Sequence, residues 1–468
     1  MKVRIPARRT RRTLAVVAIL AMLPVAMSQS GTAAASRRAT AHGPNGKAAK
    51  ARYSATPRMF TLQHGAGEPT LGITKQGEVF VTLSSGCVTS CTGEPQMLET
   101  VKPGERVIWA SSDKGRTWRD VSPGEHTTGA SPHAFSLDPY ILVDEHPDGD
   151  RIFDMDLTLA CAILSYSDDR GASWITNPLA CGEPVNDHQT LFAGKPRTST
   201  TIGYPHVLYY CFNHPAITKC TKSINGGLTF VPTAQIQAPA CGGLNGHGIV
   251  GRTGIVYVPL GSCGKPSLAI SKDEGNTWNV VQIHDEITAD GDPSVAADKA
   301  GNLYYLWNDG VDRKPWLSTS TNGGKTWSKP VMVAPKGVDE TNLATLAVGA
   351  PGKVAIAYYG TTNADNKKLG WSGYIASGVD VLGSKPTFYT ATVNNPRNPL
   401  KMGECGTRGS NRCGRVLDFI DVEIAPDGTP WGAYVDACLA TCEKSKEESY
   451  ADNLGVVGNL VGGPNLMR

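Results

Sequence analysis

A short motif that recurs five times is the feature that most constrains this chain of 468 residues. Each copy reads Ser-x-Asp/Asn-x-Gly-x-Ser/Thr-Trp/Phe, and the copies occupy 111–118, 167–174, 223–230, 271–278 and 320–327. An Asp or Asn accepts hydrogen bonds from its own turn, Gly supplies a positive φ, and the aromatic residue opens the next strand. The first serines are 56, 56, 48 and 49 residues apart, a period typical of propeller blades.

A second pattern, of strand, Gly turn and strand, precedes each copy and continues after the last one. It begins near 68, 138, 187, 245, 290, 341 and 415. We therefore predict an all-β propeller of seven blades, each a four-stranded antiparallel sheet, with the five turns on one face. Six blades are the alternative if the unit near 187 is degenerate. Residues 57–63 are predicted to form the outer strand of the last blade, because closure removes two unpaired sheet edges.

The N-terminal residues predict export. Residues 1–35 have a basic start, an apolar stretch from Leu14 to Met27 and small residues at Ala33–Ala35, as in a signal peptide. The route is Sec or, through Arg11 and Arg12, the twin-arginine pathway. The apolar stretch is short for a membrane span, so we expect a secreted protein without one. Residues 36–52 are predicted to be a flexible basic leader, and 53–468 a single, monomeric propeller domain.

The net charge bears on which partners we expect, and the cysteine content bears on whether we expect disulfides or a zinc site. The chain has a net charge of +3, but the signal and leader hold eleven basic and no acidic residues, which leaves −8 for residues 53–468. A nucleic-acid partner is therefore not expected. The twelve cysteines fall as near neighbours, which favours disulfides over a zinc site. The simplest pairing is Cys87–Cys91, Cys161–Cys181, Cys211–Cys220, Cys241–Cys263, Cys405–Cys413 and Cys438–Cys442.

Strand direction places the starts of inner strands and the ends of second strands on the face opposite the five turns. Carboxylates, histidines and aromatic rings gather at these positions and suit acid–base chemistry on a sugar. The candidate catalytic residues are Asp187, His188, His247, Asp292, Tyr358 and Asp418. The candidate substrate-binding residues are Glu68, Asp138, Trp307, Asn342 and Arg415. Each acid can also serve only to satisfy backbone groups or channel water. No metal site is predicted, and the sequence does not identify a cofactor.

The five copies resemble the Asp-box (BNR) repeat of the sialidase-like propeller superfamily, and the resemblance spans roughly residues 60–468. Sialidases of this superfamily bind a substrate carboxylate through three arginines, the first in an Arg-Ile-Pro motif. Here that motif occurs only at Arg4–Pro6, within the predicted signal, and the first inner strand has Glu68–Thr70 instead. The arginine triad is therefore not clear.

The resemblance implies a secreted, carbohydrate-active protein. A glycosidase acting on extracellular glycans is the leading hypothesis. Two alternatives remain open: a non-catalytic propeller that binds a glycan or a protein at the cell surface, and a polysaccharide lyase in which a histidine and a tyrosine move the proton.

Overall fold

The computed structural model describes residues 38–62, 67–84, 106–123, 136, 138–157, 162–177, 186–214, 217–232, 234–236, 245–261, 264–285, 292–362, 370–403, 405, 416, 418–438 and 453–468. The predicted signal peptide, residues 1–35, lies outside these residues, so it stays a prediction. Within the described ranges no helix is long and apolar enough to cross a membrane.

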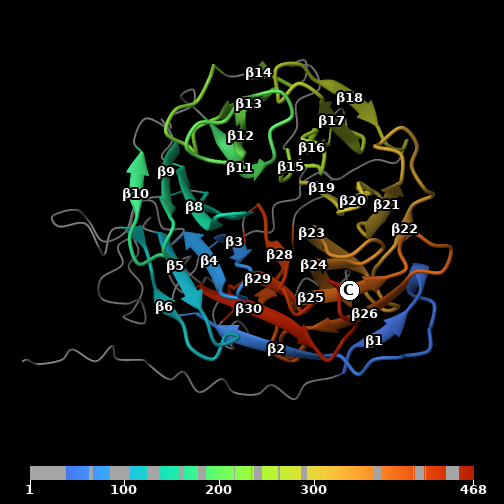
Figure 1. Ribbon diagram of the computed structural model, residues 1–468. Helices are drawn as coiled ribbons and strands as arrows, with labels where there is room; N and C mark the ends of the chain where they lie inside the picture. The colour runs from blue at the N-terminus through green and yellow to red at the C-terminus, as the bar shows by residue number, and fades with distance from the viewer. Residues whose placement is uncertain are drawn as a thin grey trace, which may run out of the picture.

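Seven sheets stand in a ring around a common centre, which confirms the predicted seven-bladed propeller (Figure 1). Blade one comprises β3 (Gly67–Ile73), β4 (Val79–Ser84), β5 (Arg106–Ser111) and β6 (Arg119–Asp120). Blade two comprises β7 (Tyr140–His146), β8 (Gly149–Leu157), β9 (Ala162–Ser167) and β10 (Ile175–Asn177). Blade three comprises β11 (Asp187–Gly194), β12 (Val207–His214), β13 (Ile217–Ser223) and β14 (Ala234–Gln235). Blade four comprises β15 (Ile249–Val250), β16 (Val256–Leu260), β17 (Ser267–Ser271) and β18 (Asn279–Gln282). Blade five comprises β19 (Ser294–Ala297), β20 (Leu303–Asn308), β21 (Pro315–Ser320) and β22 (Val331–Met332).

Blade seven joins the two ends of the chain. Its strands are β28 (Asp421–Ile424), β29 (Pro430–Asp436), β30 (Leu454–Val461) and β2 (Thr56–Thr61). β2 runs antiparallel to β30, with Thr56 opposite Val461 and Thr61 opposite Val456. This confirms that a segment beginning near residue 57 supplies the outer strand of the last blade. The closed ring leaves neither end of the repeat with an unpaired sheet edge.

Blade six is larger than the others. It contains β23 (Glu340–Val348), β24 (Val354–Thr361), β25 (Gly370–Val379) and β26 (Thr387–Thr392), together with β27 (Lys401–Met402) on β25. β1 (Thr40–His42) pairs with β26 on the outside of this blade, and the 3-10 turn η1 (Pro44–Gly46) follows it. The His42 ring nitrogen Nε2 lies 2.9 Å from Thr390 Oγ1. Part of the segment expected to be a leader is thus a strand of the propeller, because β26 offers it a free edge.

The five Asp-box turns each connect the third and fourth strands of a blade. In the first, Ser111 Oγ donates to Asp113 Oδ1 at 3.0 Å, and Gly115 N donates to Ser111 Oγ at 2.9 Å. Thr117 N donates to the same Asp113 oxygen at 2.9 Å. The same three contacts recur in the other four turns. Gly115 has φ 83°, a conformation that strongly favours glycine.

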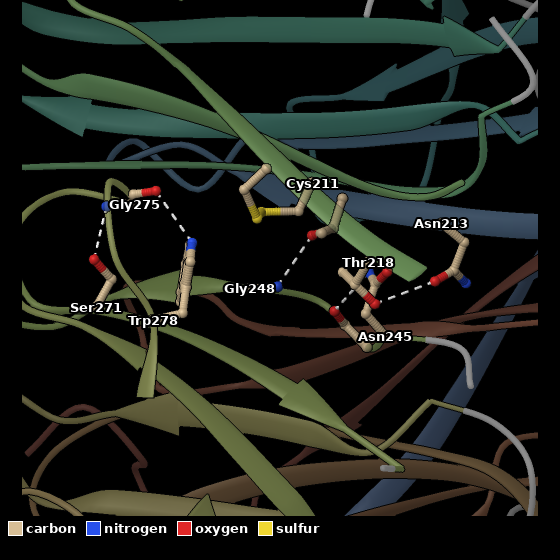
Figure 2. Close-up of a disulfide and its surroundings, with 11 residues drawn as sticks. Cys211, Asn213, Thr218, Asn245, Gly248, Ser271, Gly275 and Trp278 are labelled. Atoms are coloured by element: carbon tan, nitrogen blue, oxygen red, sulfur yellow. Dashed lines mark hydrogen bonds between the residues drawn. A yellow bond between two sulfur atoms is a disulfide. The ribbon is translucent and has the colours of Figure 1, made fainter. Parts of the chain in front are cut away.

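One hydrophobic core lies between each pair of neighbouring blades. The disulfide between Cys211 and Cys220 joins β12 to β13 across a Cα separation of 4.1 Å, as predicted (Figure 2). Cys405 and Cys438 are each part of a disulfide as well. Each of the other predicted pairs has at least one cysteine outside the described residues.

Side chains on the inner strands join neighbouring blades near the centre. In each case the side-chain oxygen of one inner strand accepts a hydrogen bond from a backbone N–H of the next, at 2.8–3.1 Å: Thr70 from Ile141, Thr190 from Gly248, Ser294 from Leu346, and Asp421 from Leu71. Gly248 is labelled at this contact in Figure 2. These bonds fix the inner strands relative to one another, and therefore position the residues at their starts.

Candidate functional site

Three inner strands begin with a β-bulge. The pairing register shifts in β3 between Gly67 and Thr70, in β11 between Asp187 and Thr190, and in β23 between Asn342 and Thr345. Each bulge contains one non-glycine residue with a left-handed backbone: Glu68 (φ 52°), His188 (φ 52°) and Leu343 (φ 53°). This conformation costs about 1–2 kcal/mol per residue. Bulges that recur beside one opening, with strained polar residues, are typical of functional sites.

The starts of the inner strands supply a connected polar cluster. We call Glu68, Asp138, His188, His247, Asp292 and Asp418 the central cluster; they come from blades one, two, three, four, five and seven in that order. His188 N donates to Asp138 Oδ2 at 3.0 Å, and Asp418 N donates to Glu68 Oε1 at 3.2 Å. His188 Nε2 lies 2.8 Å from Asp292 Oδ1. The structure therefore brings together six of the residues predicted for the site.

A pocket opens over one side of this cluster. It encloses about 280 Å³ of empty space, including solvent at its mouth. Blades four to seven line it with His247, Asp292, Pro293, Ser294, Leu343, Ala344, Thr345, Asp418, Phe419 and Ile420. Two carboxylates, one imidazole and one aromatic ring thus face a common space. No lysine or arginine is among these lining residues.

His188 is the cationic member of the cluster. Burial alone would lower the pKa of His188, but the charge of Asp292 and its hydrogen bond, helped by Asp418 and Asp138, raise that pKa to about 9. The imidazole is therefore protonated at neutral pH. Its ring also meets the edge of Phe419, with ring centroids 5.5 Å apart.

His247 has the opposite character. Burial lowers the pKa of His247 to about 3, and the positive charge of His188 adds to the effect. Its ring lies edge-on to Tyr140 at 4.9 Å and to Phe419 at 5.4 Å. His247 is therefore neutral at physiological pH, whereas His188 is charged, so the two histidines of the cluster differ in charge.

Glu68 and Asp138 form a carboxyl pair within the central cluster. Burial raises the pKa of Glu68 well above its usual value, and the charge of Asp138, a hydrogen bond between the two carboxyl groups and the charge of Asp418 raise it further. Two carboxyl groups hydrogen-bond only when one keeps its proton, so Glu68 is the neutral partner.

The other predicted site residues lie apart from the pocket or outside the described residues. Trp307 and Tyr358 are buried in the cores between blades, where Tyr358 stacks on Tyr374 at 5.1 Å. Asp187 is exposed at the first position of β11. Asn342 is buried next to the lining residue Leu343. Arg415 lies outside the described residues.

Sequence reasoning missed Phe419 and a second acidic pair. Phe419 directly follows Asp418, and a search for charged residues at strand starts passes over it. Asp421 and Glu423 lie two positions apart on β28, so both face the same side of that inner strand. The surface of Glu423 is exposed and that of Asp421 is half-buried, although β28 lies between the inner strands β3 and β23. Burial raises the pKa of Asp421 to about 7, and burial together with the charge of Asp421 raises the pKa of Glu423 to about 8.

Comparisons with known proteins give similarity to solved structures alone. No family model matches the chain, and no curated protein matches it. A protein of unknown function from Dyadobacter fermentans has 13% identity and a TM-score of 0.41, with 91% of this chain and 98% of that chain covered. A mutant NanB sialidase from Streptococcus pneumoniae has 13% identity and a TM-score of 0.43, with 86% and 70% covered. A streptogramin B lyase has 10% identity and a TM-score of 0.47, with 86% and 97% covered.

Proposed function

We propose that this chain is a secreted glycosidase that acts on extracellular glycans, with Asp292 and Asp418 as its pair of catalytic carboxyl groups. The observation that supports the proposal is that both residues line one pocket, from inner strands of different blades. Glycoside hydrolysis requires one carboxyl group that gives a proton and one that acts as base or nucleophile.

The surroundings of the two carboxyl groups differ in a way that suits these roles. The His188 imidazolium lies against Asp292 at 2.8 Å, and a cation at this distance favours the carboxylate needed for a base or nucleophile. Asp418 lies beside Glu68, whose Oε1 accepts a hydrogen bond from the Asp418 backbone N–H at 3.2 Å, and it lines the pocket together with a second carboxyl group, that of Asp292. Neighbouring carboxyl groups favour a retained proton, so Asp418 is assigned as the proton donor.

No lysine or arginine is among the described residues that line the pocket, and this bears on the choice of substrate. An anionic sugar is usually held by bidentate guanidinium contacts. The described lining residues offer carboxylates, hydroxyls and an aromatic ring in their place. A sialidase activity is therefore not proposed, and the panel of substrates should begin with sugars that carry no carboxylate.

A polysaccharide lyase is the second candidate, and one observation favours it. His247 is a neutral imidazole that lines the pocket and contacts the Tyr140 ring at 4.9 Å. The neutral form of histidine is the one that abstracts a proton next to a uronate carboxyl group, although the lowered pKa makes His247 a weak base. This candidate predicts an unsaturated product that absorbs ultraviolet light when the protein is incubated with uronate polymers. Turnover without that absorbance excludes it.

The test is release of reducing ends from a glycan panel by the purified, processed protein. We expect turnover that falls by roughly 100- to 10,000-fold in Asp292→Asn and in Asp418→Asn. Asp148→Asn, at an exposed residue of the β7–β8 turn, is the matched control and should keep full activity. Full activity in both site variants would overturn the assignment. Binding with no turnover of any glycan would instead identify a non-catalytic propeller.

A further inference from the structure

Glu68 and Asp138 each lie at the start of an inner strand and directly before a proline. Proline has no backbone N–H, so the residue that follows each acid cannot donate a hydrogen bond to its carboxyl group. Both acids are nevertheless enclosed, with 3% and 7% of their surfaces exposed. Buried carboxyl oxygens need hydrogen-bond partners. Here the partners come from the starts of other inner strands, so the two acids connect separate blades of the central cluster.

Asp138 binds the start of blade three at two points. Its Oδ2 accepts a hydrogen bond from the backbone N–H of His188 at 3.0 Å, and its backbone carbonyl accepts one from Gln189 Nε2. Both donors lie in the bulge of β11, where His188 has the left-handed φ of 52°. The bulge determines where the His188 ring lies, and the ring nitrogen Nε2 is 2.8 Å from Asp292 Oδ1. Asp138 therefore acts on Asp292 through His188.

Glu68 binds the start of blade seven in a similar way. Its Oε1 accepts a hydrogen bond from the backbone N–H of Asp418 at 3.2 Å. Glu68 itself lies in the bulge of β3 and has a left-handed φ of 52°. The backbone of Asp418, the proposed proton donor, is thus positioned by Glu68, and Asp292, the proposed base or nucleophile, is positioned by Asp138 through His188.

The two acids also meet each other through their carboxyl groups. Glu68 Oε1 is occupied by the N–H of Asp418, whereas Glu68 Oε2 is buried and receives no hydrogen bond from any N–H or hydroxyl group of the described residues. An ionised oxygen in that position is unfavourable. A protonated Oε2 instead donates to the carboxyl group of Asp138, with which Glu68 shares a side-chain hydrogen bond. The contact between the two acids therefore requires one proton.

The charges around the pair place that proton on Glu68. The backbone N–H and the positive charge of His188 favour the carboxylate form of Asp138. Burial and the neighbouring carboxyl groups of Asp138 and Asp418 raise the pKa of Glu68. Glu68 is thus the neutral partner and Asp138 the ionised one. The other titratable groups of the central cluster and of the strands beside it are the neutral His247, Tyr140 and Tyr210 and the carboxyl group of Asp292, which is paired with His188.

We propose that Glu68 and Asp138 are positioning residues that share one proton, and that this shared proton keeps Asp418 and Asp292 in place for the proposed reaction. The inference rests on the proposed glycosidase function for its effect on turnover, and it adds a regulation of that site by pH. When Glu68 loses its proton to the solvent, two adjacent carboxylates repel each other. The starts of blades three and seven then lose the contact that connects them.

Two isosteric amide variants separate the shared proton from a merely structural role. Glu68→Gln keeps one donor and one acceptor where a neutral carboxyl group has them. Asp138→Asn has one acceptor for the two donors of Glu68 and His188, and it removes the charge beside the imidazolium. Turnover at pH 6 should therefore fall by roughly 10- to 100-fold in Asp138→Asn and by much less in Glu68→Gln. Asp148→Asn is the control and should keep full turnover. Equal losses in the two site variants would overturn the proposal.

Carbon NMR of the Glu68 carboxyl group tests the wild type directly and needs no substrate. We expect a protonated carboxyl group at pH 7, and an ionised one would overturn the proposal even if both variants misfold. In Asp138→Asn, Glu68 should lose its proton at a lower pH than in the wild type, because the neighbouring negative charge is gone. The imidazole titration of His188 should also move to lower pH in Asp138→Asn and stay in place in Glu68→Gln. The reverse pattern would place the proton on Asp138 and contradict the assignment.

The pH profile of turnover tests the regulation. Glu68→Gln cannot place a second charge beside Asp138, so its alkaline limit of turnover should lie at a higher pH than that of the wild type. Coincident alkaline limits would overturn the regulation by pH. If the wild type turns over no glycan, the proposed function itself is wrong, and carbon NMR of Glu68 still decides whether the two acids share a proton.

Discussion

His188 Nε2 lies 2.8 Å from Asp292 Oδ1, and this ion pair joins the starts of inner strands from the third and fifth blades. The blade between them contributes His247, whose ring stays neutral beside the charged His188. The contact therefore bridges two blades that are not neighbours in the ring. Both side chains are largely enclosed, with 2% and 11% of their surfaces exposed, so solvent screens the pair only weakly.

The first prediction concerns the pH dependence of this pair. Because the pKa of His188 is raised to about 9 from its usual value of 6.5, its stabilising contribution is complete below about pH 6.5 and is lost as the pH rises through 9. Asp292→Asn removes the main cause, so the pKa of His188 should fall, and burial should take it below 6.5. An NMR titration of the imidazole measures this. Asp148→Asn should leave the titration unchanged, and an unchanged His188 in Asp292→Asn would contradict the assignment.

The second prediction concerns Glu423 on β28. The folded chain keeps protons on Asp421 and Glu423 at pH values where the unfolded chain has lost them, because their pKa values are raised to about 7 and about 8. Their contribution to the free energy of unfolding therefore falls as the pH rises from 5 to 8. Glu423→Gln should flatten this slope and stabilise the protein at pH 8. Urea unfolding at both pH values checks it, and parallel slopes for variant and wild type would refute it.

The third prediction concerns Glu274, whose carboxylate fastens the long β11–β12 connection to the fourth Asp-box turn. Its Oε1 accepts hydrogen bonds from the backbone N–H groups of Arg197, Thr198 and Ser199 at 2.6–3.0 Å, and Lys222 Nζ lies 3.2 Å from Oε2. Burial would raise the pKa of Glu274, but the hydrogen bond from the Ser199 hydroxyl and the three backbone hydrogen bonds hold it far below its usual value of 4.5.

Glu274→Gln should lower the free energy of unfolding by about 2–3 kcal/mol, because the contacts are hydrogen bonds to a charged group. The wild-type advantage should be complete above about pH 4.5 and disappear as the pH falls towards the depressed pKa. Lys272→Ala, at an exposed position of the same turn, is the control. Chemical unfolding at pH 7 and pH 3 measures both effects. An equal loss at the two pH values would mean that the charge of Glu274 is unimportant.

The fourth prediction compares two glycines of the Asp-box turns. Gly171 and Gly275 have φ 80° and 81°, so alanine at either position pays the same left-handed penalty of about 1–2 kcal/mol. A Cβ on Gly171 would lie 2.8 Å from Val121 Cβ, whereas one on Gly275 would lie 3.5 Å from Trp278 Cζ2. Gly171→Ala should therefore cost about 1–3 kcal/mol more than Gly275→Ala in thermal unfolding. Equal losses would show that Val121 moves aside freely.

The fold follows from local chemistry that repeats along the chain. The Asp-box motif locates the turn between the third and fourth strands of a blade. It can be recognised in the sequence because the hydrogen bonds of Asp113 and its counterparts all lie within eight residues. The outer strand of blade seven, β2, was predictable because a closed ring of repeats needs a partner for the last open sheet edge. β1 was not predicted, because Thr40–His42 is too short to show a pattern and pairs with a strand about 350 residues away.

The candidate site was predictable in part. Strand direction correctly brought the starts of six inner strands together, but it does not reveal which side of a strand a residue faces. Trp307 and Tyr358 occupy the predicted ends of second strands, yet their side chains turn into the cores between blades. The bulges at Glu68 and His188 were also beyond sequence reasoning, because a left-handed backbone at these residue types is imposed by the surrounding structure.

The most direct test of the central claim is a crystal structure of the wild-type protein with a thio-linked analogue of an oligosaccharide that it cleaves, because the sulfur linkage resists hydrolysis. We predict one sugar ring in the pocket against Phe419, with a carboxyl oxygen of Asp292 or Asp418 within about 3 Å of one of its polar atoms. A sugar bound elsewhere on the propeller, with only water in this pocket at a saturating ligand concentration, would contradict the assignment of the site.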